Sequence, residues 1–501
     1  MTARYLAGGT SFLAALLGST AAWADLKAED VWQNWVSYYE SSGMTISGQQ
    51  ARDGDTLVVS GVTMTSEVPD SSVRADLGEI RMRETGNGRV EVTFPAEMPM
   101  SITTKSPSGE TGVTTLAMTQ TGMSLVASGA PDNMTYDVTA PDVKIMLKEL
   151  TVDGTAVPMT FDIAMSGIKG TSTVAGTGTK TLSQNMAMDK IAFNVAASDP
   201  SAGGNFSAAG EYAGMTFTGS GTLPAETDMA DMNKALADGF AFDGTFGYTG
   251  GSAKFDFTDQ TGSGSGTFSD QGGSFKVGMG ATGLAYGGGS KGLNASMTVP
   301  DMPFPIEFSM GESLFNIQMP LRKSDSAQPV GLTLKLVDLA VSDGIWGMID
   351  PTAQLPHDPA TLIVDVTGTG KLGFDLLDPA LQAPGATPPE NPGTVESLDI
   401  KELLLRAVGA ELSGTGAFTF DNSMGMPMPL GTAELKLKGA NALITKLVAM
   451  GIIPEDQAMG AQMMLGMFAV PSGEDELTSK IEAKEGGQIF VNGAPLPPMF
   501  Q

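Results

Sequence analysis

The sequence predicts a mainly β protein, built as an elongated or curled antiparallel sheet that is rich in glycine and can form a groove. The 64 glycines, with abundant Thr, Ser and Val, are typical of many short strands joined by tight turns. Apolar and polar residues alternate with period 2 over most of the chain, as in half-buried strands. Helical spacing is confined to the amino end, to residues 228–237 and to a closing unit.

Residues 1–24 have the layout of a secretory signal. A single charge, Arg4, precedes an apolar core around residues 12–17, and Ala22-Trp23-Ala24 forms a small-residue end. We therefore expect cleavage after Ala24 and a periplasmic protein. No later segment offers the roughly 20 apolar residues that span a bilayer without Pro, Gly or charged interruptions, so no transmembrane anchor is expected after cleavage.

The composition disfavours several classes of partner and chemistry. A formal net charge of −28 repels nucleic acids and anionic lipid headgroups, so we expect no nucleic-acid partner. Cysteine is absent, which removes disulfides, thiolate metal ligands and a cysteine nucleophile. Charged residues make up only 17% of the chain, which indicates a folded protein that depends on burial and backbone pairing.

The amino end of the mature chain predicts one amphipathic helix over residues 25–43. Val31, Trp32, Trp35 and Tyr39 recur at helical spacing. We expect this helix to pack on one end of the sheet.

Residues 44–381 form the predicted glycine-rich β region. Val90, Val92 and Phe94 show the alternation, and Asn87-Gly88 before them is a hairpin turn signal. One helix is predicted inside the region, at residues 228–237. The aromatic residues that follow recur among glycines at even spacings, which suits strands with one covered face.

A proline-rich linker or loop is predicted at residues 382–397, before a closing unit at residues 398–501. Period-2 and helical patterns alternate in the closing unit in the order β-β-α-α-β-β. Its two helices carry apolar stripes at residues 443–448 and at Met459, Met463 and Met467. We expect this pair to cap an otherwise open end of the sheet.

Three short motifs resemble catalytic signatures, but their context disfavours each. Residues 278–283 match the dinucleotide fingerprint, yet further glycines follow where a helix is required, so we interpret them as a bend in a strand. Residues 288–292 match the nucleophile elbow around Ser290 without its strand-turn-helix setting. Ser166 and Lys169 have serine-lysine spacing, but no Lys-Thr-Gly sequence accompanies them.

The chain contains one histidine, His357, in the segment Leu355-Pro356-His357-Asp358-Pro359. A zinc site takes three or four ligands, so one histidine without cysteine favours a turn residue with local hydrogen bonds. Calcium is harder to exclude, although Asp53-Gly54-Asp55 is more simply a hairpin turn. The sequence therefore predicts no catalytic, cofactor-binding or metal-binding residue, and a protein that is not an enzyme.

The 32 methionines suggest adaptable apolar surfaces, since thioethers fill irregular spaces and accommodate varied apolar ligands. Many alternate along predicted strands, such as Met297, Met310 and Met319. Core packing is the simpler interpretation, and a lipid-lined groove is the sharper hypothesis.

Four segments carry a family resemblance: residues 302–306, residues 344–351, residues 355–362 and the closing unit. Together they resemble a Gram-negative exported family known as domain of unknown function 2125, over most of the mature chain and most strongly after Pro300. The closing unit is also similar, more loosely, to AsmA-like envelope proteins, which implies a long curled sheet around an apolar groove and lipid handling between membranes. The first family has no catalytic motif, so the resemblance transfers no functional residue.

Two hypotheses for function follow. The leading one is a non-enzymatic periplasmic protein that binds lipid or another apolar ligand in a sheet-walled groove. The alternative is a structural or assembly protein of the envelope that contacts partner proteins through its sheet edges.

Overall fold

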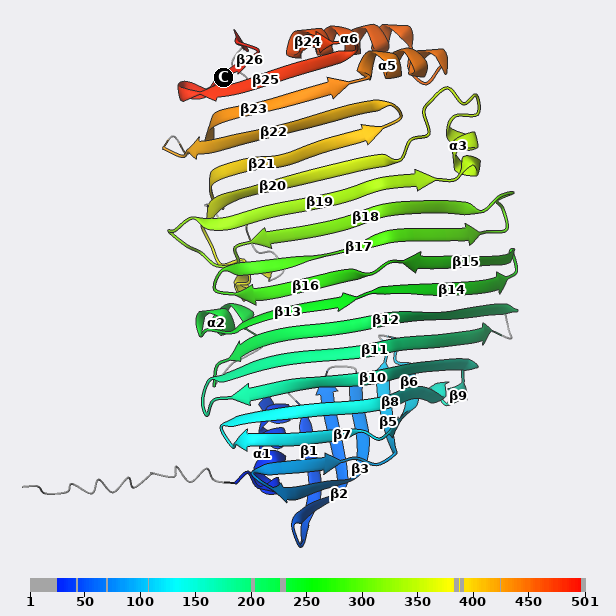
Figure 1. Cartoon of the computed structure of the whole chain (residues 1–501), viewed down its shortest axis with the longest axis vertical. Helices are drawn as coiled ribbons and strands as arrows, with labels where there is room; N and C mark the ends of the chain where they lie inside the picture. The colour runs from blue at the N-terminus through cyan, green and yellow to red at the C-terminus, as the bar shows by residue number, and fades with distance from the viewer. Residues whose placement is uncertain are drawn as a thin grey trace, which may run out of the picture.

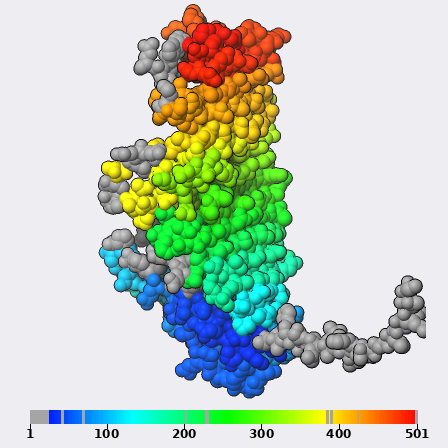
Figure 2. Space-filling view, turned by 90° about the vertical axis from the view of Figure 1, so that its left-hand side faces the viewer, coloured from blue at the N-terminus to red at the C-terminus, as the bar shows by residue number. Residues whose placement is uncertain are grey.

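The computed structural model describes residues 25–41, 44–68, 71–106, 108–199, 203–225, 231–382, 387, 392–423 and 425–496. The predicted signal at residues 1–24 lies outside this part of the chain. Within it, the strands form one antiparallel sheet, stacked along the long axis of the molecule in the order of the sequence (Figures 1 and 2). The sheet is open, since β1 and β27 lie at opposite ends and are not paired with each other. The predicted fold class is therefore confirmed.

The described helices lie at the ends and along the edges of the sheet (Figure 1). Their bounds are α1 Ala28–Ser41, α2 Met232–Ala237, α3 Asp343–Ile349, α4 Pro379–Gln382, α5 Ala440–Ala449 and α6 Glu455–Phe468, with a 3₁₀ turn, η1, at Glu485–Gly487.

The strands fall into three consecutive groups. The base of the sheet contains β1 Thr45–Asp53, β2 Thr56–Val68, β3 Ser71–Gly86, β4 Arg89–Thr93, β5 Glu97–Lys105, β6 Thr111–Thr121, β7 Ser124–Ala130, β8 Asn133–Val152 and β9 Thr155–Ala156. The middle contains β10 Met159–Ala175, β11 Lys180–Asp199, β12 Gly204–Leu223, β13 Ala241–Tyr248, β14 Gly250–Asp259, β15 Gly262–Asp270, β16 Gly273–Gly280, β17 Gly283–Thr298, β18 Ile306–Met319, β19 Gln328–Val341 and β20 Ala360–Leu372. The closing group contains β21 Gly393–Ala407, β22 Ala410–Asp421, β23 Met428–Lys438, β24 Val470–Gly473, β25 Glu476–Lys484, β26 Gln488–Val491 and β27 Ala494–Pro495.

One topological arrangement occurs twice. Between the long strands β3 and β8, the width of the sheet is filled by two side-by-side pairs of half-length strands, β4–β7 and β5–β6. Between β12 and β17, the pairs β13–β16 and β14–β15 fill the width in the same chain order. We call these two regions the splits of the sheet.

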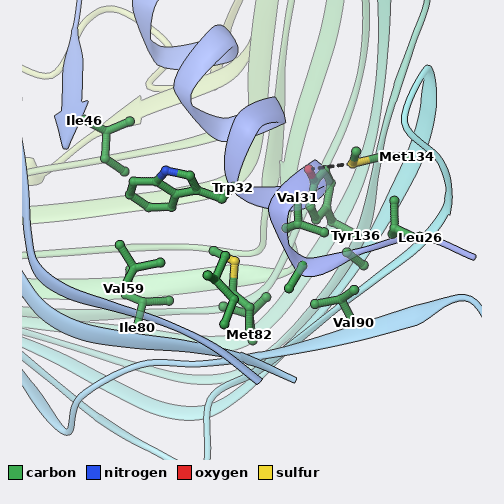
Figure 3. Packing of buried hydrophobic residues seen from close by; sticks show 14 of the residues in the cluster. Leu26, Val31, Trp32, Ile46, Val59, Ile80, Met82, Val90, Met134 and Tyr136 are labelled. Atoms are coloured by element: carbon green, nitrogen blue, oxygen red, sulfur yellow. Dashed lines mark hydrogen bonds between the residues drawn. The ribbon is translucent and has the colours of Figure 1, made fainter. Parts of the chain in front are cut away.

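The principal core lies at the base, where the sheet curls around α1 (Figure 3). Val31 is fully buried and Trp32 is 4% exposed, packed among strand side chains such as Val59, Ile80 and Met82. Trp35 and Tyr39 pack against this core and are partly buried. The predicted amphipathic helix is confirmed over residues 28–41.

An ionic cluster joins α1 to the sheet. Arg52 of β1 binds Glu29 of α1 and lies 2.6 Å from the Oε1 atom of Glu84 in β3. Glu84 also accepts a hydrogen bond from the backbone N–H of Ala28. The hydrogen bond from Arg52 lowers the pKa of Glu29. Burial raises the pKa of Glu84, but the hydrogen bonds from Arg52 and the Ala28 backbone outweigh burial, so this pKa is lowered as well.

Single residues with positive φ interrupt otherwise extended strands and change which face their side chains occupy. At Gly61 φ is +59°, and both Val59 and Val62 are fully buried in the same core. Three residues apart in an unbroken strand, they would lie on opposite faces. The interruption therefore shifts the alternation by one, as a bulge does. The positions of this kind are Gly61, Gly78, Gly167, Gly214, Gly292 and Asp338.

Several local predictions are confirmed. Asn87 and Gly88 both have positive φ and join β3 to β4 as a hairpin turn, and Gly54 turns β1 into β2. Near residue 230, α2 begins at Met232 behind the cap residue Asp231, whose carboxylate accepts from the backbone N–H of Lys234. The predicted helix residues 228–230 lie outside the described residues.

The closing unit contains the predicted order β-β-α-α-β-β as β22, β23, α5, α6, β25 and β26. Most of β21 precedes this series, and the short strands β24 and β27 are additional. Two details differ. Residues 393–397, assigned to the loop, begin β21, which pairs directly with β20, so the strands on either side of this loop are neighbours in one sheet. The predicted methionine stripe of α6 is wrong as a packing surface, because Ala458, Ala461 and Leu465 face inward and the methionines are exposed. Small alanines allow the helix to approach its neighbours closely on that side.

We expect Trp32→Ala to destabilise the chain by about 3–5 kcal/mol, because it leaves a cavity between α1 and the curled base. Chemical denaturation followed by circular dichroism measures the change. Met348→Ala in α3, where the side chain is 57% exposed, is the control and should cost well under 1 kcal/mol. Equal effects of the two substitutions would contradict a core centred on α1.

A candidate apolar binding face

Cross-strand pairing places one apolar row across nearly the whole sheet. Residues paired across antiparallel strands point to the same face, so a chain of pairs defines a row. The row begins in the core that contacts α1 and continues through the middle into the closing strands. Its members in order are Leu57, Met82, Val92, Leu125, Val138, Gly170, Met186, Phe217, Phe246, Phe275, Gly288, Phe315, Leu334, Val364, Leu403, Gly414, Leu435 and Ser479.

Parallel rows on the same face are also largely apolar. One runs through Val277, Tyr286, Ile317, Leu332, Val366 and Ile400. Another is a leucine row in the closing strands, through Leu336, Leu362, Leu405, Leu412, Leu437 and Leu477. We call the side of the sheet that carries these rows the apolar face.

The neighbouring row, one residue along each strand, lies on the opposite side and is mostly polar. Its members are Thr56, Arg83, Glu91, Val126, Asp137, Thr171, Asn185, Thr218, Thr245, Lys276, Gly287, Asn316, Thr333, Asp365 and Glu402. We call this side the polar face. The two sides of the sheet are therefore chemically distinct from base to closing unit.

The apolar face continues across the other half of the sheet because the strand interruptions shift the alternation. Around Gly292 of β17, the apolar positions change from Leu284 and Tyr286 to Leu293 and Ala295. Pairing beyond the interruptions gives a second apolar row, through Met98, Met118, Ile145, Ile163, Phe193, Gly210, Ala253, Phe268, Ala295, Phe308 and Val341.

Aromatic rings on this face lie over glycines of the neighbouring strand. A Cβ added to Gly251 would be 2.1 Å from the Tyr212 ring, and one added to Gly266 would be 2.4 Å from the Phe255 ring. Glycine leaves space for the ring of its partner, which covers the bare backbone. These rings cover the neighbouring backbone, so aromatic side chains form part of the surface of this face.

The apolar face remains half-open to solvent in the middle and upper sheet. Phe275, Tyr286, Phe315, Leu332 and Leu405 retain exposed fractions of 37–48%. Three of these rings contact one another: the centroids of Phe275 and Tyr286 are 5.1 Å apart, and those of Tyr286 and Phe315 are 6.4 Å apart. Contiguous exposed apolar surface of this kind marks a binding site more often than a free surface.

A polar group interrupts the apolar face near the second split. Asp270 is 8% exposed, and its Oδ1 atom accepts from the backbone N–H of Gly272. The rings of Tyr212 and Tyr248 meet edge to face beside it, with centroids 5.5 Å apart. Burial and the Asp270 charge raise the pKa of Tyr248 to about 12, so both phenols stay neutral at physiological pH.

The polar face carries shallow hollows. One of about 200 Å³ includes Lys276, Gly287, Asn316 and Thr333, all members of the polar row. Small side chains leave such spaces between strands. On the apolar face the rings fill the corresponding space over glycine, so we expect a ligand there to lie along the surface.

His357 lies beside α3, in the segment that leads to β20. Its ring stacks on Trp346 with centroids 4.3 Å apart, and its Nε2 atom is 3.9 Å from Oδ2 of Asp350. Asp350 is buried and accepts from the backbone N–H of Leu355. Burial opposes ionisation of Asp350, but hydrogen bonds from the Leu355 and Gln354 backbone outweigh it and lower its pKa. Sequence reasoning missed the stacking and the buried carboxylate.

The three catalytic look-alikes lie within strands and hairpins. Ser290 is in β17, with its hydroxyl 3.0 Å from that of Ser313 in β18. Residues 278–283 form the hairpin between β16 and β17, which is a turn where the sequence predicted a bend within one strand. Ser166 and Lys169 flank the interruption at Gly167 in β10. The structure does not bring Ser290 and His357 into a hydrogen bond.

Among the described residues, no group of three or more His, Asp and Glu side chains is placed to hold a metal ion. The helices of the same residues are all too short or too polar to cross a bilayer.

The geometry defines a class of protein: a single-layer antiparallel sheet whose first and last strands do not pair, with one apolar face and a helix packed inside its curled base. Residues 290–499 match the family described as "Uncharacterized protein conserved in bacteria (DUF2125)", which confirms the predicted family over this part of the chain. The match is shorter than predicted, since it covers somewhat less than half of the chain. No curated protein matches the chain. The similarity of the closing unit to AsmA-like envelope proteins stays a prediction.

Gly251→Ala should destabilise the chain by about 1–3 kcal/mol, since the new methyl group would overlap the Tyr212 ring. Gly178→Ala, with no atom within 4 Å of the new Cβ, is the matched control. Thermal denaturation compares the two. If Tyr212→Leu does not reduce the cost of Gly251→Ala, the ring is not its cause.

Asp350→Asn should destabilise the chain at neutral pH and have less effect in acid. The folded pKa lies below the ordinary value of 3.8, so the stabilisation is present above that value and is lost as the pH falls through the folded pKa. Denaturant titrations of both proteins from neutral to acidic pH test this. A difference in stability that stays constant with pH would contradict a role for the charged form.

Proposed function

We propose that this chain is a non-enzymatic periplasmic protein that binds lipid or another apolar ligand along its apolar face. The observation that carries the proposal is the uninterrupted pairing that links the α1 core to the closing strands through apolar and glycine positions. The expected signal at residues 1–24 supports the compartment.

The size of the face supports lipid as the ligand. At about 4.8 Å per strand, the part of the row beyond the α1 core, from Gly170 to Leu435, extends for roughly 50 Å. The hydrocarbon core of a bilayer is about 30 Å thick, so the face has room for several acyl chains. A covering of acyl chains would remove half-exposed rings such as Tyr286 and Phe315 from water, at about 25 cal/mol for each Å² buried.

The chemistry of the face favours an uncharged, flexible ligand portion. Apolar side chains and glycines dominate its rows, and Asp270 with its two tyrosines is a local polar group among them. Such a surface offers few directional hydrogen bonds, so it suits acyl chains better than sugars or nucleotides.

An alternative function, assembly with an envelope protein, is favoured by the free edge of β1. Most residues of β1 are exposed, and its described backbone ladder pairs with β2. An edge of this kind accepts an added strand. Crosslinking from cysteines introduced in β1 should capture one partner reproducibly if this function is correct.

Phe315→Glu should reduce the lipid that copurifies from the periplasm by about tenfold or more, since it places a charge among apolar side chains. Native mass spectrometry measures the bound lipid. Asn316→Glu is the matched control, because it places the same charge at the next residue of β18 on the polar face. A lipid-free wild-type protein, or equal losses in both variants, would contradict the proposal.

A further inference from the structure

The closing end of the molecule carries an exposed apolar cluster. Its members come from α6 and the segments beside it: Ile452, Met459, Met463, Met464, Met467, Phe468 and Val470. Their exposed fractions lie between 43% and 69%, and the four methionines, at 57–69%, are more exposed than the side chains of the apolar face. We call this cluster the tip. It lies at the far end of the sheet from α1 (Figure 1).

The tip follows the apolar face closely along the chain. The leucine row passes through Leu437 and Leu477 and ends at Pro471 of β24. Val470 begins β24, and Phe468 ends α6 two residues earlier. The chain therefore passes from the apolar face at Pro471 to α6 within three residues, while Val470 pairs with Thr478 on the polar side.

The two ends of the sheet differ. At the base, α1 fills the curled sheet, where Val31 of α1 and Met82 of β3 are fully buried. At the closing end, the inward side of α6 consists of Ala458, Ala461 and Leu465, and its methionines face outward. Apolar surface thus reaches solvent at the closing end, where a ligand could be exchanged.

The charges around the tip indicate an uncharged partner. Glu455 and Asp456 occupy the first turn of α6, which contains no Lys or Arg. The nearby Lys436 is paired with Glu476, and Lys480 with Glu482. Lys446, in the last turn of α5, is a cation close to the tip, and the two carboxylates of α6 outnumber it. Anionic headgroups would meet more negative than positive charge there, so the tip suits a neutral surface.

The size of the tip argues against a second copy of the chain. A stable protein interface uses about 20–30 residues a side, whereas the tip has five apolar side chains on a helix of about 21 Å and two beside it. A bilayer needs no complementary shape, and flexible thioethers adapt to acyl chains.

We propose that the tip inserts into the surface of a neutral, zwitterionic lipid bilayer, and that lipid passes there between the bilayer and the apolar face. The second clause rests on the proposed function; the first does not. Insertion buries the methionines among acyl chains, and the carboxylates of the first turn stay at the headgroups.

The test compares two double variants of the full chain. Met463→Ser with Met467→Ser removes the centre of the tip, and Met348→Ser with Ile349→Ser removes two apolar groups of α3 that are also more than half exposed. Co-sedimentation with phosphatidylcholine vesicles should fall by about tenfold or more for the tip variant and by less than about twofold for the control. Wild-type binding should persist at high salt and weaken when anionic phosphatidylglycerol is added.

Other results would overturn the inference. Equal vesicle binding by the tip variant and the wild type would do so, as would binding that requires anionic lipid. A wild-type dimer that becomes monomeric in the tip variant, by light scattering, would assign the tip to a second copy.

A second measurement separates this inference from the proposed function. Copurified lipid, by native mass spectrometry, should be unchanged in the tip variant, while transfer of a fluorescent lipid from vesicles should slow about tenfold with the loss of binding. A lipid-free wild type that still binds vesicles refutes the proposed function and leaves the insertion of the tip standing. If the tip variant retains its copurified lipid and binds vesicles as well as the wild type does, the inference is refuted and the proposed function stands.

Discussion

Side-chain alternation is the constraint on which this structure depends. Each residue of an extended strand faces the opposite side from its neighbours, so a single error of register would place apolar groups on the polar face. The strands keep Phe315 and Asn316, or Leu334 and Thr333, on opposite faces through a long series of pairs. The interruptions at positions such as Gly61 and Gly292 serve the same constraint. Apolar residues change from even to odd positions, or the reverse, at these points, and the interruption keeps them on the apolar face.

The abundance of glycine follows from this constraint. A one-layer sheet has no second layer to fill the space above its backbone. Rings such as Tyr212 and Phe255 lie down on a facing glycine and supply that covering from within the sheet. The apolar side chains, which could otherwise cause aggregation, are thus spread over one face. A bound ligand would complete their burial there.

Much of the architecture was predictable from the sequence, for physical reasons. Periodicity reports secondary structure, so the helix at residues 28–41 and the order of the closing unit followed from the spacing of apolar residues. Turns such as Asn87-Gly88 were predictable because they need positive φ. Periodicity does not report which side of a short helix is buried, and the methionines of α6 were misassigned because apolar character was equated with burial. The apolar face and the splits depend on which strands are neighbours, which are contacts remote in sequence. The stacking of His357 on Trp346 depends on how the segment after α3 folds back onto that helix.

The two splits have a mechanical consequence. Each interrupts the strands at mid-width, so hydrogen-bond ladders of half length replace one that crosses the whole sheet. Resistance to bending is lowest where a ladder is broken, and the sheet turns around α1 at the first split (Figure 1). The second split, between β12 and β17, has the same construction at mid-height. The sheet therefore contains two seams at which its strands are interrupted: one lies beside the helix inside the curl, and the other lies at mid-height of the open sheet.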